Sequence, residues 1–96
     1  MKIHFIGIGG IGLSALARYY LAKNHEVTGS DLEQSEITEA LKKEGAKINI
    51  SHDPDNIPSD TDQVIYTAAI NEDNPELIKA KEENIEAPIK LKKRSL

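Results

Sequence analysis

The sequence contains no cysteine and no tryptophan, and its aromatic residues are three Tyr and one Phe among 96 residues. Without cysteine, neither a disulfide framework nor a thiolate metal site is possible. The scarcity of aromatic residues predicts a core made of Ile, Leu, Val and Ala. A chain of this length indicates one small domain.

Long apolar runs and an excess of positive charge are also missing. The longest apolar stretches fall far short of the ~20 residues that a membrane-spanning helix needs. The start, MKIHFIGIGG, lacks the basic beginning and long apolar stretch of a signal peptide, so we expect a cytoplasmic protein without a membrane partner. The net charge is −4, with both signs interspersed, which argues against a nucleic-acid partner. A phosphate ligand stays possible, because main-chain N–H groups bind phosphate without lysine.

Apolar runs and helical stripes alternate along the chain. Strands are predicted at 2–6, 25–31, 46–50 and 87–91, and the stretch 63–70 begins as another strand that ends before residues 67–69. One helix is predicted to begin near Gly10 or Ile11, and a short second helix to end before Gly45. A third is predicted to follow an Asn74 cap, with Leu77, Ile78 and Ala80 facing the core. This order predicts an α/β fold: a Rossmann-like open parallel sheet of about five strands with helices on both faces.

The segment GIGGIG, residues 7–12, follows the first predicted strand and opens the first helix. In G-x-G-x-x-G the first glycine allows the tight turn, the second lets a phosphate approach the backbone, and the third allows close helix packing. Gly10 adds another position without a Cβ. The helix also points free N–H groups and its positive dipole end at this loop. The pattern predicts binding of a nucleotide diphosphate, whereas the alternative is a turn that only packs helix on strand.

Asp31 ends the second predicted strand, 19 positions after Gly12. An acid at this place typically accepts hydrogen bonds from ribose hydroxyls. The alternative for Asp31 is a helix cap or a solvated turn. A full dinucleotide fold has two such halves, and this chain supplies one half and two further strands. The spacing therefore leaves open a nucleoside diphosphate sugar and the alternative of an NAD(P)-binding module from a dehydrogenase or a regulatory protein.

Two segments resemble the Mur ligase family. IHFIGIGGIGLSALA, residues 3–17, is similar to the family's H-F-x-G-I-G-G-I-G-M-S stretch, with Leu13 in place of Met. DQVIYTAAINEDNPELIKA, residues 62–80, is similar to its D-x-V-(V/I)-x-(S/T)-x-A-I-x-x-D-N-P-E stretch. The resemblance covers roughly residues 2–90. It implies a domain at 1–90, followed at 91–96 by the start of a linker to an ATP-binding central domain.

The resemblance also implies an activity. The whole enzyme would use ATP and Mg²⁺ to join L-alanine to UDP-N-acetylmuramate in peptidoglycan precursor synthesis. Its first domain would bind the UDP part, its central domain ATP and its C-terminal domain alanine. Because the sequence has no G-x-x-x-x-G-K-[ST], we expect this chain to be the UDP-binding domain alone, inactive by itself, without catalytic residues, metal ligands or a bound cofactor. A related ligase that recycles murein tripeptide is less favoured, since its loop carries a cysteine where this chain has Gly9 or Gly10.

Carried over by position, the resemblance implies a set of residues that contact the UDP-sugar. The set is Gly7, Gly9, Gly10, Ile11, Gly12, Ser14, Ser30, Asp31, His52, Thr67, Ala68 and Ala69. The backbone of residues 9–12 would meet the diphosphate, with Ser14 nearby, and Asp31 would bind ribose beside Ser30. His52 would lie near the uracil, and residues 67–69 would border the same crevice. The alternatives are a turn-capping or solvated His52 and a Thr67 hydroxyl that only satisfies the strand end. His4 is expected to be structural.

Overall fold

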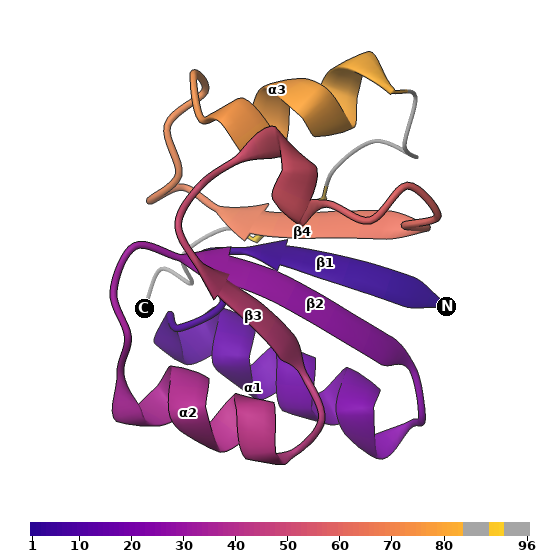
Figure 1. Cartoon of the computed structure of the whole chain (residues 1–96), viewed down its shortest axis with the longest axis vertical. Helices are drawn as coiled ribbons and strands as arrows, with labels where there is room; N and C mark the ends of the chain where they lie inside the picture. Colours follow the sequence, from indigo (N-terminus) through magenta and orange to yellow (C-terminus); the bar gives the residue numbers. More distant parts are fainter. Residues whose placement is uncertain (84–88, 92–96) are drawn as a thin grey trace.

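Five parallel strands form the centre of the computed structural model, which describes residues 1–83 and 89–91 (Figure 1). The strands are β1 (Lys2–Ile6), β2 (Glu26–Asp31), β3 (Lys47–Ile50), β4 (Gln63–Thr67) and β5 (Ile89–Leu91). Their order in the sheet is β3-β2-β1-β4-β5, and every neighbouring pair is parallel. The predicted fold class is confirmed. Of the linker predicted at 91–96, Leu91 ends β5 and the other residues lie outside the described part of the chain.

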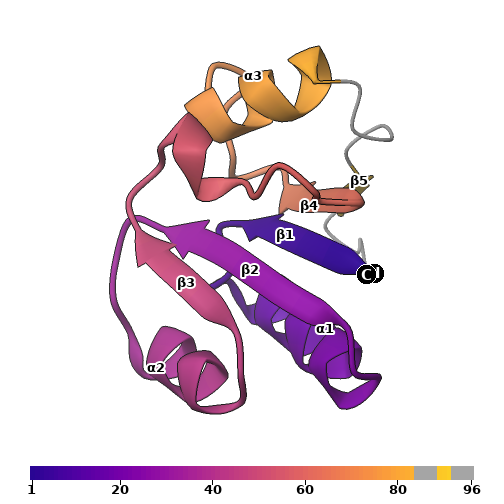
Figure 2. The same cartoon turned by 45° about the vertical axis from the view of Figure 1, so that its right-hand side comes forward.

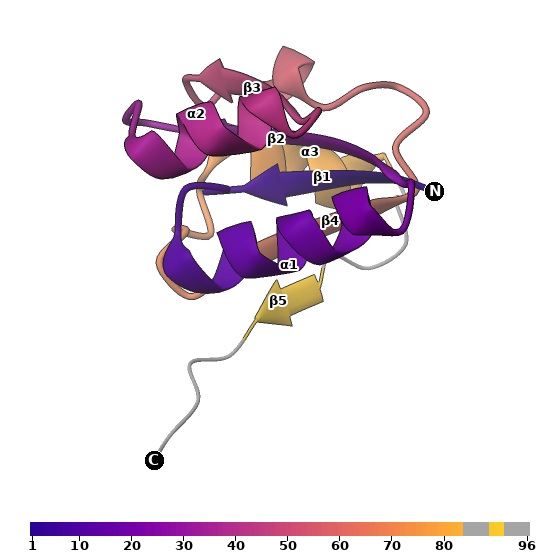
Figure 3. The ribbon, with the colours of Figure 1, turned by 90° about the horizontal axis from the view of Figure 1, so that it is seen from below.

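Helices cover both faces of the sheet. They are α1 (Ile11–Ala22), α2 (Glu36–Lys43), the short 3₁₀ helix η1 (Pro54–Asn56) and α3 (Pro75–Glu82). Helices α1 and α2 lie side by side on one face, and α3 and η1 cover the other (Figures 2 and 3). Side chains alternate along β1, so Ile3 and Phe5 belong to the core beneath α1 and α2 while Ile6 packs in the core beneath α3. The aliphatic core predicted from composition is confirmed.

The third helix begins where the sequence predicts. Asn74 Oδ1 accepts hydrogen bonds from the N–H groups of Glu76 at 2.9 Å and Leu77 at 3.4 Å, and Pro75 occupies the first turn. Leu77 is buried as predicted, and so is Ala80. The prediction for Ile78 is wrong, because its side chain is 40% exposed. Successive helical residues point about 100° apart, and the inward position beside Leu77 belongs to Glu76.

The sheet topology brings four loops to one edge. The chain runs from β1 outward to β2 and β3, and then returns to place β4 on the other side of β1. The strands are parallel, so the loops that follow β1, β2, β3 and β4 all leave from the carboxyl ends of their strands. Open α/β sheets bind ligands outside this edge, at the point where the strand order reverses. In this chain that point lies between β1 and β4.

Candidate functional site

The glycine loop, residues 7–12, is folded largely by its own hydrogen bonds. Gly7 has φ +84°, a conformation that favours glycine. The N–H groups of Gly7 and Ile8 both donate to the carbonyl of Ser30, at 2.8 and 2.9 Å, and Gly10 N–H donates to the Gly7 carbonyl at 3.0 Å. These bonds hold the loop against the end of β2, so the amides of these three residues already have partners.

Gly9 is tied to Asp31. Its N–H donates to Asp31 Oδ2 at 2.8 Å, and Asp31 Oδ1 accepts from the N–H of Glu33 at 3.3 Å. A Cβ placed on Gly9 would lie 2.7 Å from Oδ2, which is closer than real Cβ atoms come to an oxygen. Gly9 therefore makes room for the carboxylate of this chain, and the predicted ribose-binding acid is bound to the predicted phosphate loop.

The first amides of α1 are free of such bonds. Ser14 N–H donates to the Gly10 carbonyl at 2.8 Å and begins the helical pattern. Across residues 1–83 and 89–91, the N–H groups of Ile11 and Gly12 have no hydrogen-bond acceptor. Both residues are exposed. The start of a helix carries a positive partial charge, so these amides suit an anion.

The space around two glycines of this loop would admit a side chain. A Cβ on Gly12 would meet nothing within 4 Å, and one on Gly10 would meet only the Gly7 carbonyl oxygen, at 3.4 Å. Gly10 also has an ordinary extended backbone, with φ −66° and ψ 149°. By contrast, a Cβ on Gly29 would lie 2.6 Å from the Ile8 side chain. The bare surface at Gly10 and Gly12 is thus open toward the outside of the molecule.

The predicted hydroxyl groups have partners inside the chain. Ser14 is buried and its Oγ donates to the Ile11 carbonyl at 3.0 Å. Ser30 is buried and donates to Glu76 Oε1 at 2.9 Å. Thr67 Oγ1 accepts from the N–H of Ala69 at 3.3 Å, as in the alternative in which it satisfies the strand end. Ala68 and Ala69 are exposed at this edge.

A buried carboxylate collects hydrogen bonds from three elements. Glu76 Oε1 lies 2.5 Å from His4 Nε2 and accepts from Ser30 Oγ at 2.9 Å. Its Oε2 lies 3.2 Å from His52 Nδ1 and accepts from Asn56 Nδ2 at 3.1 Å. Oε2 also accepts from the N–H of Asp53, at 3.2 Å. We call these residues the Glu76 cluster: His4, Ser30, His52, Asp53, Asn56 and Glu76.

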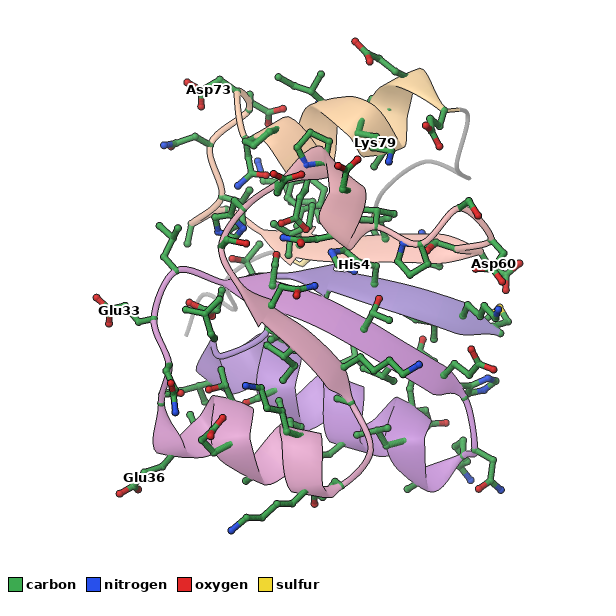
Figure 4. The ribbon with its side chains drawn as sticks, in the orientation of Figure 1. His4, Glu33, Glu36, Asp60, Asp73 and Lys79 are labelled. Carbon is green, nitrogen blue, oxygen red and sulfur yellow. The ribbon has the colours of Figure 1, made fainter. Side chains whose placement is uncertain are left out.

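The Glu76 cluster joins β1, β2 and η1 to the start of α3. His4, which Figure 4 labels on β1, also bonds Thr28 Oγ1 at 2.7 Å, so its expected structural role is confirmed. Burial by itself would raise the pKa of Glu76. The hydrogen bond and charge of His4, together with the hydrogen bonds from Asn56 and Ser30, outweigh burial and lower the pKa. The carboxylate is therefore ionised at neutral pH.

Glu76 is a functional residue that the sequence analysis did not single out. The signal that marks it is helical spacing, since Glu76 shares the inward face with Leu77 and Ala80. A charged residue on the buried face of a helix requires buried partners. Its partners follow from the parallel topology, because the loop after β3 and the start of α3 meet at the carboxyl edge of the sheet.

A hollow of about 360 Å³ opens at the same edge. We call it the His52 hollow. It is lined by Leu32, His52, Ala69, Ile70, Asn71, Asp73, Asn74 and Pro75. His52 and Ala69 thus come together as predicted, with Leu32 directly after Asp31, whereas the glycine loop is not part of its lining. A hollow of similar size lies beside Lys2, Glu26 and Lys47, and its lining includes the far end of the loop after β3, at Pro58, Asp60 and Thr61.

Within residues 1–83 and 89–91, no helix is long and apolar enough to cross a membrane. In the same residues, no group of three or more His, Asp or Glu side chains is placed to hold a metal ion.

Comparisons with known proteins identify relatives of the chain. Residues 2–90 match the model of one family, described as "Mur ligase family, catalytic domain". A UDP-N-acetylmuramate–L-alanine ligase from Clostridium perfringens is 58% identical over 84 residues, which is 88% of this chain and 18% of that protein. The crystal structure of a UDP-N-acetylmuramate–alanine ligase from Thermotoga maritima has a TM-score of 0.86 and 46% identity, covering 94% of this chain and 20% of that one.

A more distant structural neighbour is a murein peptide ligase from Psychrobacter arcticus. Its TM-score is 0.77 at 24% identity, over 95% of this chain and 18% of that chain. At this identity the likeness shows the fold alone. The chain spans about a fifth of the length of each of these relatives.

Proposed function

The chain belongs to the Mur ligase family, and on this premise we propose that it binds the UDP moiety of UDP-N-acetylmuramate. The whole enzyme is then an ATP-dependent ligase that adds L-alanine to this substrate in peptidoglycan precursor synthesis, in the cytoplasm. The relatives that carry this activity in their names are 46% and 58% identical to the chain.

One observation carries the proposal: the bare, exposed start of α1. Gly10 and Gly12 lack side chains although neither the backbone conformation of Gly10 nor the space around the two residues requires glycine. Gly12 lies inside α1, where glycine costs up to about 1 kcal/mol relative to alanine. An external ligand that lies against the backbone explains why this cost is tolerated. The N–H groups of Ile11 and Gly12, which have no acceptor in the described part of the chain, are the donors that a diphosphate requires.

The contacts proposed for the other residues follow from their positions. Gly9 is not a free donor, because its N–H already serves Asp31. We assign the diphosphate to the amides of Ile11 and Gly12. The ribose is assigned to the Asp31 carboxylate, which accepts two hydrogen bonds from the described residues and has lone pairs left for a ligand. The uracil is assigned to the His52 hollow, whose lining includes Ala69. In this arrangement the hydroxyl groups of Ser14, Ser30 and Thr67 stabilise the loops around the site and do not contact the ligand.

ATP and Mg²⁺ are proposed for the whole enzyme, bound outside this chain. No described residue is assigned to ATP or to the metal ion. The proposed partners of the chain are the central and C-terminal domains of the same enzyme. The choice of amino acid lies with those domains, and assays of the whole enzyme with L-alanine and with murein tripeptide distinguish the two ligase reactions.

Isothermal titration calorimetry tests the proposal directly. The chain is titrated separately with UDP-N-acetylmuramate, with UDP and with NADH. We expect heat from both uridine ligands and none from NADH. Tight binding of NADH without a response to either uridine ligand overturns the proposal in favour of the NAD(P)-binding module.

A further inference from the structure

The hydrogen bonds of the Glu76 cluster determine which nitrogen of each histidine ring carries a proton. An ionised carboxylate only accepts hydrogen bonds, so every group that contacts it must donate. Asp53 N–H and the Asn56 amide are donors by nature. The two histidine nitrogens that face Glu76 must therefore carry their protons: Nε2 of His4 and Nδ1 of His52.

Ser30 strengthens this assignment for His52. The Ser30 hydroxyl donates its proton to Glu76 Oε1 at 2.9 Å, and its oxygen lies 3.1 Å from His52 Nδ1. Because the hydroxyl proton is already used, Ser30 presents a lone pair to the imidazole ring. Nδ1 of His52 thus faces two acceptors, Glu76 Oε2 and Ser30 Oγ, and both favour a proton on Nδ1.

The second ring nitrogen of His52 is left for a ligand. In a neutral imidazole with a proton on Nδ1, Nε2 is a hydrogen-bond acceptor. Among the described residues, the hydrogen bonds of the His52 ring all run through Nδ1. The side chain is 12% exposed and lines the His52 hollow beside Leu32 and Asn74. Nε2 of His52 can therefore accept a hydrogen bond from an N–H group of a ligand in this hollow.

We propose that Glu76 is a positioning residue for base recognition: it holds His52 with the proton on Nδ1, so that Nε2 accepts from the imide N–H of a uracil-type base. This inference rests on the proposed function and adds how the base is selected. Uracil carries a proton on N3, whereas N3 of cytosine is an acceptor that would face the lone pair of Nε2. One such mismatch leaves a hydrogen bond unmade and corresponds to about a tenfold difference in affinity.

The tautomer is measured without any ligand. In the ¹⁵N-labelled chain at neutral pH, ¹⁵N NMR distinguishes a protonated from a bare imidazole nitrogen. We expect His52 to show a protonated Nδ1 and a bare Nε2. In Glu76→Gln the amide can also donate, so the preference of His52 for this tautomer weakens. Glu82→Gln, which removes the same charge at an exposed position of α3, leaves the His52 signals unchanged.

Base selection is measured by titrating the chain with UDP and with CDP. We expect the parent and Glu82→Gln to prefer UDP about tenfold, and Glu76→Gln to lose most of this preference. His52→Asn covers the case in which Glu76→Gln fails to fold. The asparagine amide can still donate toward Glu76 but places no acceptor where Nε2 was, so UDP and CDP bind it about equally.

The outcomes separate this inference from the proposed function. If the parent binds neither nucleotide, UDP binding fails and base recognition fails with it. If the parent binds UDP and CDP equally, or if Nε2 of His52 carries the proton, the role of Glu76 is overturned while diphosphate binding stands. A preference for UDP that survives in both Glu76→Gln and His52→Asn also overturns it.

Discussion

The N–H of Gly9 donates a 2.8 Å hydrogen bond to Asp31 Oδ2, and the same oxygen would lie 2.7 Å from a Cβ on Gly9. Two features that the sequence presents as separate ligand contacts are therefore joined. The register explains how, since β1 and β2 pair Ile6 with Ser30 and so end at the same level of the sheet. The absent side chain at Gly9 serves the carboxylate, and the bare positions that remain for a ligand are those at the start of α1.

Removal of the Asp31 carboxylate tests its assignment to the ribose. In Asp31→Ala we expect UDP to bind about ten- to a hundredfold more weakly, because charge-assisted hydrogen bonds contribute about 1.5–3 kcal/mol. Isothermal titration calorimetry gives the affinity. Glu33→Ala, an exposed acid two positions away, is the control with the same change in charge. An Asp31→Ala affinity within twofold of the parent rules out a ribose contact.

Alanine at two glycines of the loop is expected to have opposite effects on stability. In Gly9→Ala the new methyl group overlaps Asp31 Oδ2, so the carboxylate must move away from the Gly9 N–H that it binds, and the melting temperature falls. In Gly12→Ala the methyl group meets nothing within 4 Å, and alanine is the better helix former, so stability is unchanged or rises by up to about 1 kcal/mol. Thermal unfolding followed by circular dichroism measures both. Equal losses in the two variants would contradict the separate roles of these glycines.

A bulkier side chain at Gly12 tests the phosphate contact itself. In Gly12→Val the new side chain fits without a clash, because the space around this position is free. It covers the N–H groups at the start of α1, and we expect UDP affinity to fall at least tenfold while the far-ultraviolet circular dichroism spectrum is retained. Ala15→Val, an exposed site one turn further along α1, is the control for a β-branched residue in this helix. Unchanged affinity in Gly12→Val would place the diphosphate elsewhere.

The sequence predicts the elements better than it predicts their partners. Local signals suffice for α3, where Asn74 and Pro75 mark its first turn, and for the parallel order of the sheet. The predicted parallel order also places His52 and Ala69 at the same edge of the sheet, where the strands end. Glu76 was missed because its five donors come from residues 4 to 56, and such distant pairing has no local pattern. The Gly9–Asp31 bond was missed for the same reason, since G-x-G-x-x-G describes a ligand loop without its internal acceptor.

The inward face of α3 is tested by two neighbouring aliphatic residues. Leu77 is fully buried in the core beneath α3, whereas Ile78 is 40% exposed. We expect Leu77→Ala to lower the free energy of unfolding by about 2–5 kcal/mol, the range for a buried leucine. We expect Ile78→Ala to change it by less than about 1 kcal/mol. Urea denaturation measures both values, and a larger loss for Ile78→Ala would contradict the helix orientation.

The pH dependence of stability tests whether Glu76 is ionised in the folded chain. Its pKa is lowered from the ordinary value of 4.5, so the unfolded chain takes up the proton first as pH falls. The stability that ionised Glu76 contributes is therefore complete above the ordinary pKa and is lost as pH falls through the lower pKa of the folded state.

Urea denaturation of the parent and of Glu76→Gln, from pH 7 to pH 3, gives the difference in free energy of unfolding between the two. The contributions of acids that do not interact with Glu76 largely cancel in this difference. The groups that face Glu76 are His4 and His52, and their pairing with the carboxylate is part of this difference. We expect the parent to be more stable than Glu76→Gln near pH 7. The difference between their free energies of unfolding is expected to narrow steadily below about pH 4.5. A difference that does not narrow below about pH 4.5 means that the buried carboxyl is already protonated in the folded chain and that the donor pattern of the Glu76 cluster is wrong.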